Sequence, residues 1–502
     1  ATANAADNAT LTVSTTDAKF AGKTVNAYKM FSATVSGDGK AVSYTLTDEW
    51  KPFFKNSVGL TGVTDENVND KANDYVSKLK DSTLVAFATK ASNWAQTKAN
   101  NITADATATV SADASNGKYT ATFTGLGYGY YVVAVPGATL ANAKSQYATL
   151  VSVHSTKVDA DIKGDLPTVD KKVQVDGTGK DATDAKIGDT LTFTLTSTIP
   201  DMSAYDTYTF NFKDTLSKGL TFGQVKSVKV ENVTLTENTD YTVTTPTASN
   251  NNTLTVAMKD FKTKQQANAG KKITVTYTAT LNENAVVGGA GNVNSAKIQY
   301  SNNPSTNGTG ESEPSKVRVF TYGFTVDKYT GDQYTDAATR LAGAEFTLAH
   351  KDGSAISFVQ VSAGSATANA VYRVAKAGET GTTTITTPAN GKVVFEGLKN
   401  GEYTLTETEA PAGYNKLASA IGVKVNGQNN GTDTTNATVT ITYNNDNGND
   451  YNQTASNGVI PVQNKSGAIL PGTGGMGTIA FTVIGVLVIA LGVAWTLKRK
   501  NA

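Results

Sequence analysis

Two lysines stand at positions where strand periodicity should turn their side chains into a protein core. Lys171 lies midway between Val169 and Val173, and Lys328 lies two residues after Val326. Successive residues of a β-strand point to opposite faces, so each lysine should share the buried face of its apolar neighbours. A fully buried lysine is costly unless it is neutralised or paired. The alternative is a lysine at a strand end whose amine reaches solvent.

Each lysine has an acid and an asparagine that the same periodicity turns inward. For the first lysine these are Asp214, which ends the pattern Phe-Asn-Phe-Lys-Asp, and Asn294 on a later strand. For the second they are Glu407, which ends Tyr-Thr-Leu-Thr-Glu, and Asn464 at the end of the last expected strand. The sequence therefore predicts two triplets of Lys, acid and Asn, each facing one core.

Such a triplet can form a covalent cross-link. Burial lowers the pKa of a lysine and raises that of a carboxyl group, so the amine can be neutral and nucleophilic. The protonated acid can then donate a hydrogen bond to the Asn side-chain carbonyl and polarise it. Attack of the amine with loss of ammonia leaves an isopeptide bond. The predicted bonds are Lys171–Asn294, with Asp214 as the catalytic acid, and Lys328–Asn464, with Glu407 as the catalytic acid.

Each bond should tie the first strand of its domain to the last and close a loop of more than a hundred residues. In the chain-entropy description of cross-links, that closure adds roughly 4–5 kcal/mol of stability. The reaction is a single self-modification, so we predict that the chain is not an enzyme.

The segments that carry these residues have the pattern of β-strands. Thr, Val, Tyr and Phe alternate with polar residues, as in Leu191–Leu195, Ile273–Tyr277 and Tyr403–Glu407, and Gly/Asn/Asp/Ser clusters separate the runs. Several such strands per segment predict a mainly β fold of three tandem immunoglobulin-like β-sandwich domains. Apolar residues at helical spacing from Asp65 to about Trp94 predict a helical insertion in the first domain.

Changes in composition divide the chain into domains. Strand patterns end at Asp161–Pro167 and again at the polar stretch Pro304–Pro314, and each following domain begins with Val-Asp-Lys. A chain of 502 residues has the length of about three domains of ~150 residues. The predicted units are residues 1–165, with the helical insertion, 166–320, 321–466 and the C-terminal segment 470–502.

The C-terminal segment predicts export and anchoring. Leu470-Pro471-Gly472-Thr473-Gly474 precedes an uncharged apolar run, Thr478–Leu497, long enough to form a transmembrane helix. The basic cluster Lys498–Lys500 should hold the tail on the cytoplasmic side. The pentapeptide resembles the LPXTG sorting signal of Gram-positive bacteria, which a sortase cleaves between Thr473 and Gly474. The alternatives are a plain membrane anchor, which needs no pentapeptide, and a eukaryotic lipid-anchor signal, which needs no basic end.

Composition argues against several other functions. The chain has 44 basic and 43 acidic residues and no basic block outside the tail, so nucleic-acid binding has no electrostatic support. It has no cysteine, so disulfides cannot reinforce it. Its two histidines, His154 and His350, lie in different predicted domains without ligand spacing, and we predict no metal and no cofactor. Because the anchor implies export, we expect Ala1 to lie near a processed N-terminus.

The stretch Tyr403–Tyr414, with the sequence YTLTETEAPAGY, resembles the E-box YxLxETxAPxGY of Gram-positive pilins. Together with Lys328, Asn464 and the sorting signal, it looks like the last, collagen-adhesin B-type domain of a major (backbone) pilin. Residues 167–303 resemble the preceding A-type domain. The likeness covers residues 167–475 and only loosely the first domain, which has no Glu at the E-box position and is expected to lack an internal bond.

The resemblance implies a structural shaft subunit of a pilus that is attached covalently to the cell wall of a Gram-positive bacterium. Its implied partners are pilus-specific and housekeeping sortases, other copies of itself, minor pilins, peptidoglycan and host surface ligands. The alternative is a monomeric wall-anchored adhesin, or a basal or tip pilin, that binds host ligands.

Polymerisation would join Thr473 to a lysine of the next subunit. In the family this lysine lies in a YPKN-like motif near the end of the first domain, and that motif is missing here. By position, Lys163 is the best match and Lys157 is the runner-up, while the alternative is that both are ordinary surface lysines.

Overall fold

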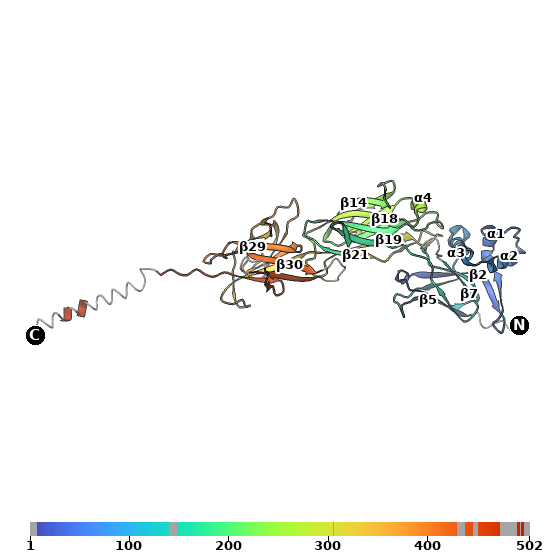
Figure 1. The fold of residues 1–502 in the computed structure, drawn as a ribbon, viewed down its shortest axis with the longest axis horizontal. Coiled ribbons are helices and arrows are strands. Elements are labelled where there is room, and N and C mark those ends of the chain that lie inside the picture. The colour runs from blue at the N-terminus through green and yellow to red at the C-terminus, as the bar shows by residue number, and fades with distance from the viewer. Residues whose placement is uncertain are drawn as a thin grey trace.

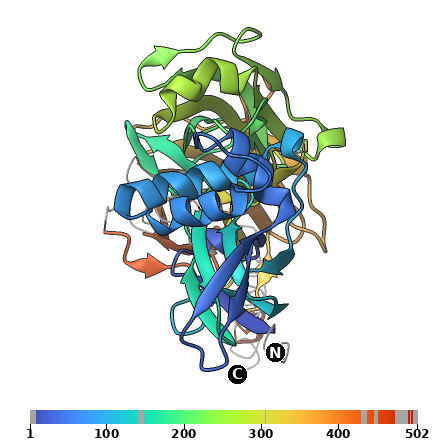
Figure 2. The same ribbon diagram turned by 90° about the vertical axis from the view of Figure 1, so that its right-hand side faces the viewer.

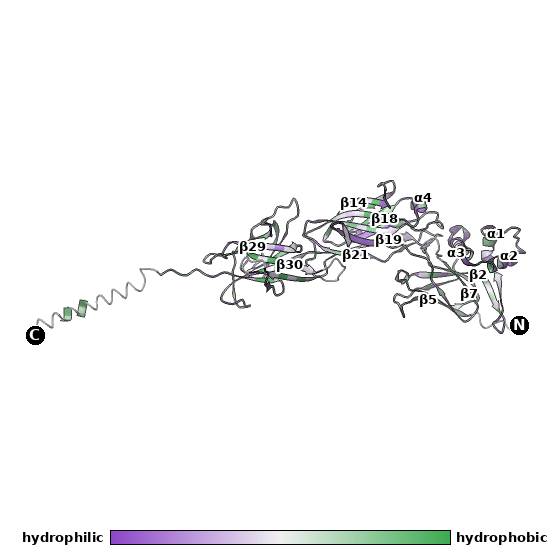
Figure 3. Ribbon diagram, in the orientation of Figure 1, coloured by the Kyte–Doolittle hydropathy of each residue, from purple (hydrophilic) through white to green (hydrophobic). Residues whose placement is uncertain are grey.

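The structure is a computed structural model, and it describes residues 8–139, 148–304, 306–428, 437–444, 450–471, 489–491 and 493–495. Its strands form three successive two-sheet sandwiches along one long axis, from the first domain at one end to the third (Figure 1). Hydrophobic and hydrophilic residues alternate along the strands (Figure 3), which is why one face of each sheet is buried. The mainly β prediction is confirmed.

The first sandwich packs a three-stranded sheet against a five-stranded one. The smaller sheet has the order β5-β1-β8, with β1 and β8 parallel, and the larger has β3-β2-β6-β7, with β4 also pairing with β2. The strands of the first domain are β1 Ala9–Thr15, β2 Thr24–Val35, β3 Val42–Leu46, β4 Ala106–Thr109, β5 Tyr119–Leu126, β6 Gly129–Ala134, β7 Ala148–Val153 and β8 Lys157–Asp161.

The helical insertion begins earlier than its periodicity predicts. The helices are α1 Lys51–Asn56, α2 Val68–Ser77 and α3 Asp81–Gln96. The first is too short to show a repeating pattern, yet its Phe53 and Phe54 are fully buried. With Trp50 before them and Phe87 of α3, they form a second hydrophobic core between the helices and the larger sheet. Figure 2, viewed from this end of the molecule, shows the blue helices lying across the strands.

The second sandwich has six strands in one sheet and seven in the other. The first has the order β10-β9-β12-β18-β14-β15, and the second has β11-β21-β19-β13-β17-β16, with β20 also pairing with β19. The elements are β9 Asp170–Val175, β10 Thr178–Lys180, β11 Ala182–Asp184, β12 Thr190–Thr198, β13 Phe210–Leu216, β14 Leu220–Val230, β15 Val233–Thr234, β16 Tyr241–Thr244, β17 Thr253–Met258, α4 Phe261–Gln265, β18 Lys272–Leu281, β19 Asn292–Ser301, β20 Thr309–Glu311 and β21 Ser315–Phe320.

The described part of the polar stretch Pro304–Pro314 belongs to this second sandwich, inside the predicted unit 166–320. It contains β20, and both β20 and the following β21 pair with β19. Only Thr321 separates the end of β21 from the first strand of the next domain. Polar composition suggested a boundary there, but short edge strands beside solvent are polar as well.

The third sandwich consists of two six-stranded sheets. One has the order β23-β22-β28-β26-β25 with β33 parallel to β22, and the other has β27-β24-β29-β30-β31-β32. The strands are β22 Tyr322–Thr330, β23 Thr339–Arg340, β24 Glu345–His350, β25 Phe358–Ser362, β26 Ala370–Val374, β27 Ile385–Thr386, β28 Lys392–Leu398, β29 Gly401–Glu409, β30 Ile421–Gln428, β31 Thr438–Tyr443, β32 Gln453–Thr454 and β33 Val459–Gln463.

The predicted transmembrane helix Thr478–Leu497 lies mostly outside the described residues. Within it, residues 489–491 and 493–495 are helical. In the described part of the chain, no helix is both long and apolar enough to cross a bilayer.

Candidate cross-linking sites

The second sandwich brings its predicted triplet together across the two sheets. Lys171 lies on β9 of one sheet, whereas Asp214 and Asn294 lie on β13 and β19, which are neighbours in the other. All three side chains point into the core, as their alternation with apolar residues predicts, and none has measurable exposure to solvent.

A tyrosine that the sequence analysis did not single out connects the three residues. The amine of Lys171 forms an ion pair with Asp214 and donates a hydrogen bond to the Tyr277 hydroxyl at 2.7 Å. That hydroxyl donates to Asp214 Oδ2 at 2.7 Å and accepts a hydrogen bond from Asn294 Nδ2 at 2.6 Å. Tyr277 lies on β18 and ends the predicted strand pattern Ile273–Tyr277. Its inward position follows from the same alternation. The sequence offered one signal for the role of Tyr277, because a buried tyrosine hydroxyl requires a hydrogen-bond partner.

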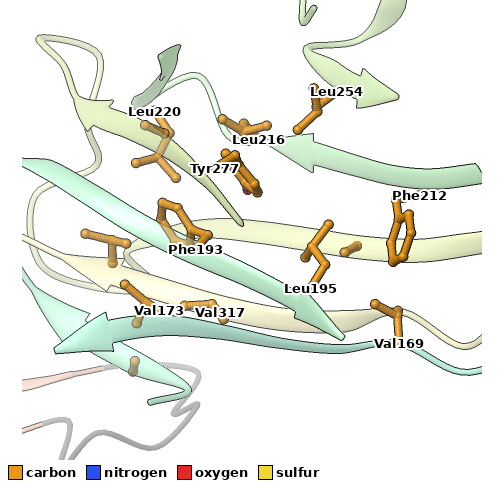
Figure 4. Packing of buried hydrophobic residues seen from close by; sticks show 14 of the residues in the cluster. Val169, Val173, Phe193, Leu195, Phe212, Leu216, Leu220, Leu254, Tyr277 and Val317 are labelled. Atoms are coloured by element: carbon orange, nitrogen blue, oxygen red, sulfur yellow. The ribbon is translucent and has the colours of Figure 1, made fainter. Parts of the chain in front are cut away.

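Aromatic rings cover the lysine. Its Nζ lies 4.9 Å from the ring centre of Phe193 and 4.9 Å from that of Tyr277. The two rings are stacked with their centres 5.3 Å apart, and Figure 4 shows them side by side among the apolar side chains of the sandwich. The amine is therefore in a dry site, where ionised groups are unfavourable.

Burial shifts the ionisable groups of the site toward their uncharged forms. Burial lowers the pKa of Lys171 from its ordinary 10.5 to about 8, although the carboxylate beside it acts in the opposite direction. Burial also raises the pKa of Asp214, against the opposing effect of Lys171. Asp214 Oδ1 and Asn294 Oδ1 are buried with no hydrogen-bond partner in the described structure. A proton on Asp214 could be donated to the amide oxygen of Asn294. A protonated Asp214 would therefore give each of these two oxygen atoms a hydrogen-bond partner.

The third sandwich assembles its triplet differently. Lys328 on β22 and Asn464, just after β33, come from neighbouring parallel strands of one sheet, and Glu407 reaches them from β29 of the other. The backbone N–H of Asn464 donates to the carbonyl oxygen of Tyr329 at 3.0 Å, which fixes the end of β33 beside the lysine. The Lys328 and Glu407 side chains have no measurable exposure, and Asn464 is buried.

Here the acid contacts both reacting groups directly. Glu407 Oε2 lies 3.0 Å from Lys328 Nζ, although the two are not aligned as a hydrogen bond. Glu407 Oε1 accepts hydrogen bonds from Asn464 Nδ2 at 2.9 Å and from the backbone N–H of Leu417 at 3.0 Å. The carbonyl oxygen of Asn415 holds the same Asn464 nitrogen at 3.0 Å. Burial lowers the pKa of Lys328 to about 8.

The expectation that both bonds tie the first strand to the last is wrong for the second domain. There β19, which carries Asn294, is followed by β20 and β21 of the same sheet. The third domain fits the expectation, because β22 is its first strand and β33 its last. The expectation overlooked β20 and β21, which lie between Asn294 and the end of the predicted unit at residue 320.

The remaining predicted residues lie apart from these two sites. Lys163 is exposed just after β8, and Lys157 is exposed at the first position of that strand. Leu470 is 83% exposed and Pro471 is also exposed, whereas Thr473 and Gly474 lie outside the described residues. Within residues 8–139 and 148–165, the buried polar side chains are Ser92, Gln96 and Thr139, so the described part of the first domain buries no lysine.

Three segments of the chain match known protein families. Residues 187–304 match the family described as Gram-positive pilin backbone subunit 2, Cna-B-like domain. Residues 332–442 match the SpaA prealbumin-like fold domain, and residues 462–502 match the LPXTG cell wall anchor motif. The Cna-B-like description of the middle segment differs from the A-type class that its motifs suggested.

Individual relatives include a streptococcal surface protein. The trypsin-resistant surface T6 protein of Streptococcus pyogenes serotype M6 is 25% identical over 279 residues, which cover 50% of this chain and 44% of the relative. The structure of the T6 backbone pilin has 20% identity and a TM-score of 0.49, covering 85% of this chain and 83% of that one. The Corynebacterium diphtheriae major pilin SpaA has 16% identity and a TM-score of 0.48, covering 91% of this chain and 100% of that one.

Proposed function

We propose that this chain, a relative of the Gram-positive backbone pilins, is the shaft subunit of a covalently polymerised pilus on the surface of a Gram-positive cell. The observation that carries the proposal is the pair of buried Lys–acid–Asn clusters in consecutive sandwiches, in a chain whose residues 462–502 match the LPXTG anchor motif. Covalent cross-links suit a protein that bears tension. A chain without cysteine cannot form them as disulfides, so isopeptide bonds would serve instead.

The clusters support self-formed isopeptide bonds in the second and third domains. Neutral Lys171 attacks Cγ of Asn294, and Lys328 attacks Cγ of Asn464. In each reaction the new N–C bond forms, the amide C–N bond breaks, and one proton moves from the amine to the nitrogen that leaves as ammonia. Asp214 and Glu407 act by polarising the amide oxygen and by handling protons. No external reagent is consumed.

Assembly of the shaft would use the C-terminal signal and a lysine near the first domain boundary. A pilus-specific sortase cleaves after Thr473 and joins it to Lys163 of the next copy, with Lys157 as the second choice. Lys163 is exposed on a segment outside the sheets, and such a segment can enter an enzyme active site. A housekeeping sortase joins the terminal subunit to peptidoglycan, and minor pilins complete the fibre. Contact with host surface ligands belongs to this assembled form.

Immunoblotting of cell-wall extracts tests polymerisation. We expect a ladder of high-mass species that survives boiling in detergent. A single band at the subunit mass would instead indicate a monomeric wall-anchored adhesin, and bands limited to one or two sizes would indicate a basal or tip pilin.

A further inference from the structure

The two cross-linking sites differ in what touches the nitrogen that must leave. In the third domain Asn464 Nδ2 donates to Glu407 Oε1 at 2.9 Å, while the other oxygen of that carboxyl group lies 3.0 Å from Lys328 Nζ. One carboxyl group therefore spans the distance between the attacking amine and the leaving nitrogen. It can take a proton at one oxygen and supply one from the other.

In the second domain the acid is one methylene shorter and does not make that span. Asp214 Oδ2 contacts Lys171, but Asp214 Oδ1 has no hydrogen-bond partner in the described structure. Asn294 Nδ2 donates instead to the hydroxyl of Tyr277 at 2.6 Å. The same hydroxyl lies 2.7 Å from Lys171 Nζ and 2.7 Å from Asp214 Oδ2. It contacts the leaving nitrogen, as Oε1 of Glu407 does in the third domain.

We propose that Tyr277 is the catalytic proton relay of the second-domain cross-link, an inference that rests on the isopeptide chemistry proposed above. When Lys171 Nζ attacks Asn294 Cγ, the attacking nitrogen acquires a positive charge and must lose a proton. The lone pair of Asn294 Nδ2 is then no longer shared with the carbonyl group, so Nδ2 can accept a proton. Nζ passes its proton to the Tyr277 oxygen while the hydroxyl passes its own proton to Nδ2. The Cγ–Nδ2 bond then breaks, ammonia leaves and the hydroxyl is restored.

The surroundings require such a relay to be part of the protein. Lys171, Asp214, Tyr277 and Asn294 have no measurable exposure, so bulk water does not reach the reacting atoms in the folded domain. Burial holds the pKa of Tyr277 well above its ordinary value, so its phenol stays neutral and can both accept and donate a proton. Asp214 is left to polarise the amide oxygen, as the unpartnered Oδ1 atoms of both residues suggest.

The test compares rates of bond formation in the full chain carrying Tyr277→Phe. Unlinked chain is kept in urea and diluted into buffer, samples are quenched over time, and the linked peptides of both domains are quantified by mass spectrometry. General acid–base catalysis contributes at least about a hundredfold, so we expect the Lys171–Asn294 bond to form roughly a hundredfold more slowly. The Lys328–Asn464 bond in the same molecules should form at the wild-type rate.

Tyr205→Phe is the matched control. Tyr205 is buried in the same sandwich, and its hydroxyl donates to the carbonyl oxygen of Ser301 at 3.4 Å, away from the cross-linking site. This variant loses the same atom and should link both domains at the wild-type rate. In the double variant Tyr277→Phe/Asp214→Glu, the longer acid can reproduce the third-domain arrangement, and we expect it to restore a large part of the lost rate. A purely structural role for the hydroxyl predicts no such rescue.

The outcomes separate this inference from the chemistry on which it rests. If Tyr277→Phe links its second domain as fast as wild type, the relay is wrong while the isopeptide proposal stands. If neither bond forms in the wild-type chain, the isopeptide proposal itself fails. Should Tyr277→Phe not fold, 3-fluorotyrosine at position 277 keeps the ring and hydroxyl but makes the phenol more acidic. A relay then predicts a changed rate in the second domain alone, and an unchanged rate would overturn it.

Discussion

Lys171 and Lys328 are costly residues to bury, and the acid beside each one offsets only part of the cost. Removing a charged amine and a carboxylate from water is unfavourable even when they pair. Conversion of the amine to an amide removes its charge from the core permanently. The proposed reaction would therefore relieve part of the electrostatic cost of burying its groups.

Removing either acid should block one bond without affecting the other. We expect intact-mass measurement to show the loss of two ammonia molecules from the wild-type chain and of one from Asp214→Ala or Glu407→Ala, because each acid contacts only its own lysine. Lys172→Ala, next to Lys171 but partly exposed, is the control and should still lose two. A wild-type chain that loses none would refute both triplets.

The rate of bond formation should depend on pH through the proton that lysine and acid share. The reactive form of the Lys171–Asp214 pair holds one proton. Below the raised pKa of Asp214 both groups are protonated, and the amine cannot attack. Above about pH 8, the pKa of Lys171, the last proton is lost and no acid remains to polarise the amide of Asn294.

We therefore expect a plateau that ends near pH 8 and a fall of about tenfold per pH unit above it. Dilution of urea-denatured chain into buffers from acidic to alkaline pH, with the linked fraction followed over time, measures this profile. A rate that keeps rising well above pH 8 would show that the acid need not be protonated.

At the scale of strands, the two proposed cross-links would restrain their domains to different extents. In the third domain Lys328 lies on the first strand and Asn464 just after the last, so the proposed bond would enclose nearly the whole sandwich. In the second domain the proposed bond would join β9 to β19 across the two sheets and leave β20 and β21 beyond it. The third-domain bond would carry a force along the chain, so residues 329–463 would not unfold under it. Residues 295–320 of the second domain lie outside their bond and could still unfold.

Single-molecule stretching should reveal this difference. We expect the linked third domain to give no unfolding extension, because its ends are joined within the bond. Glu407→Ala should release residues 329–463, at about 3.3–3.6 Å per residue when fully extended. The linked second domain should lengthen only by its terminal strands, and by much more in Asp214→Ala. Equal extension with and without Glu407 would contradict the third-domain bond.

At the scale of the whole molecule, the second and third domains are held together closely. The backbone N–H of Asn400 donates to Asp184 at 2.6 Å, and the N–H of Ile187 donates to the carbonyl oxygen of Gly397 at 3.0 Å. Gly397 has a positive φ of 87°, and a Cβ there would lie 2.6 Å from Ile187 Cδ1, so only glycine permits this approach. The second and third sandwiches follow one another along the long axis of the molecule (Figure 1), and these contacts join them.

The acceptor lysine determines which domains carry tension in the fibre. If Lys163 receives Thr473 of the neighbouring subunit, load enters after β8 and leaves through the C-terminal signal, passing through both cross-links. The first domain would then stand beside the load path, which agrees with the expected absence of an internal bond there.

Lys163→Ala should therefore abolish the high-mass ladder in wall extracts and leave wall-anchored monomer, whereas Lys157→Ala should leave the ladder unchanged. Both side chains are exposed, so neither change should disturb folding. The internal bonds, measured by mass on the same extracts, should persist in both variants. A ladder that disappears only with Lys157→Ala would move the junction to β8, and one that survives both changes would exclude both lysines.

Much of this protein could be predicted from local pattern. The period of two turned Lys171, Asp214 and Asn294 inward, and the order of motifs at the C-terminus indicated the anchor. These inferences succeed because a side chain's face on a strand depends only on its neighbours in sequence. The same rule could have predicted that Tyr277 points into the core, but not that its hydroxyl lies beside Lys171.

Tertiary structure alone decided which inward side chains meet. The register of β13, β18 and β19 and the packing of two sheets place one tyrosine hydroxyl against amine, acid and amide in the second domain, while a longer acid fills that role in the third. It also showed that Pro304–Pro314 leads into a further strand of the same sheet. Both depend on contacts between residues far apart in the chain, whereas strand periodicity fixes which face a side chain takes but not which residue of which strand lies opposite it.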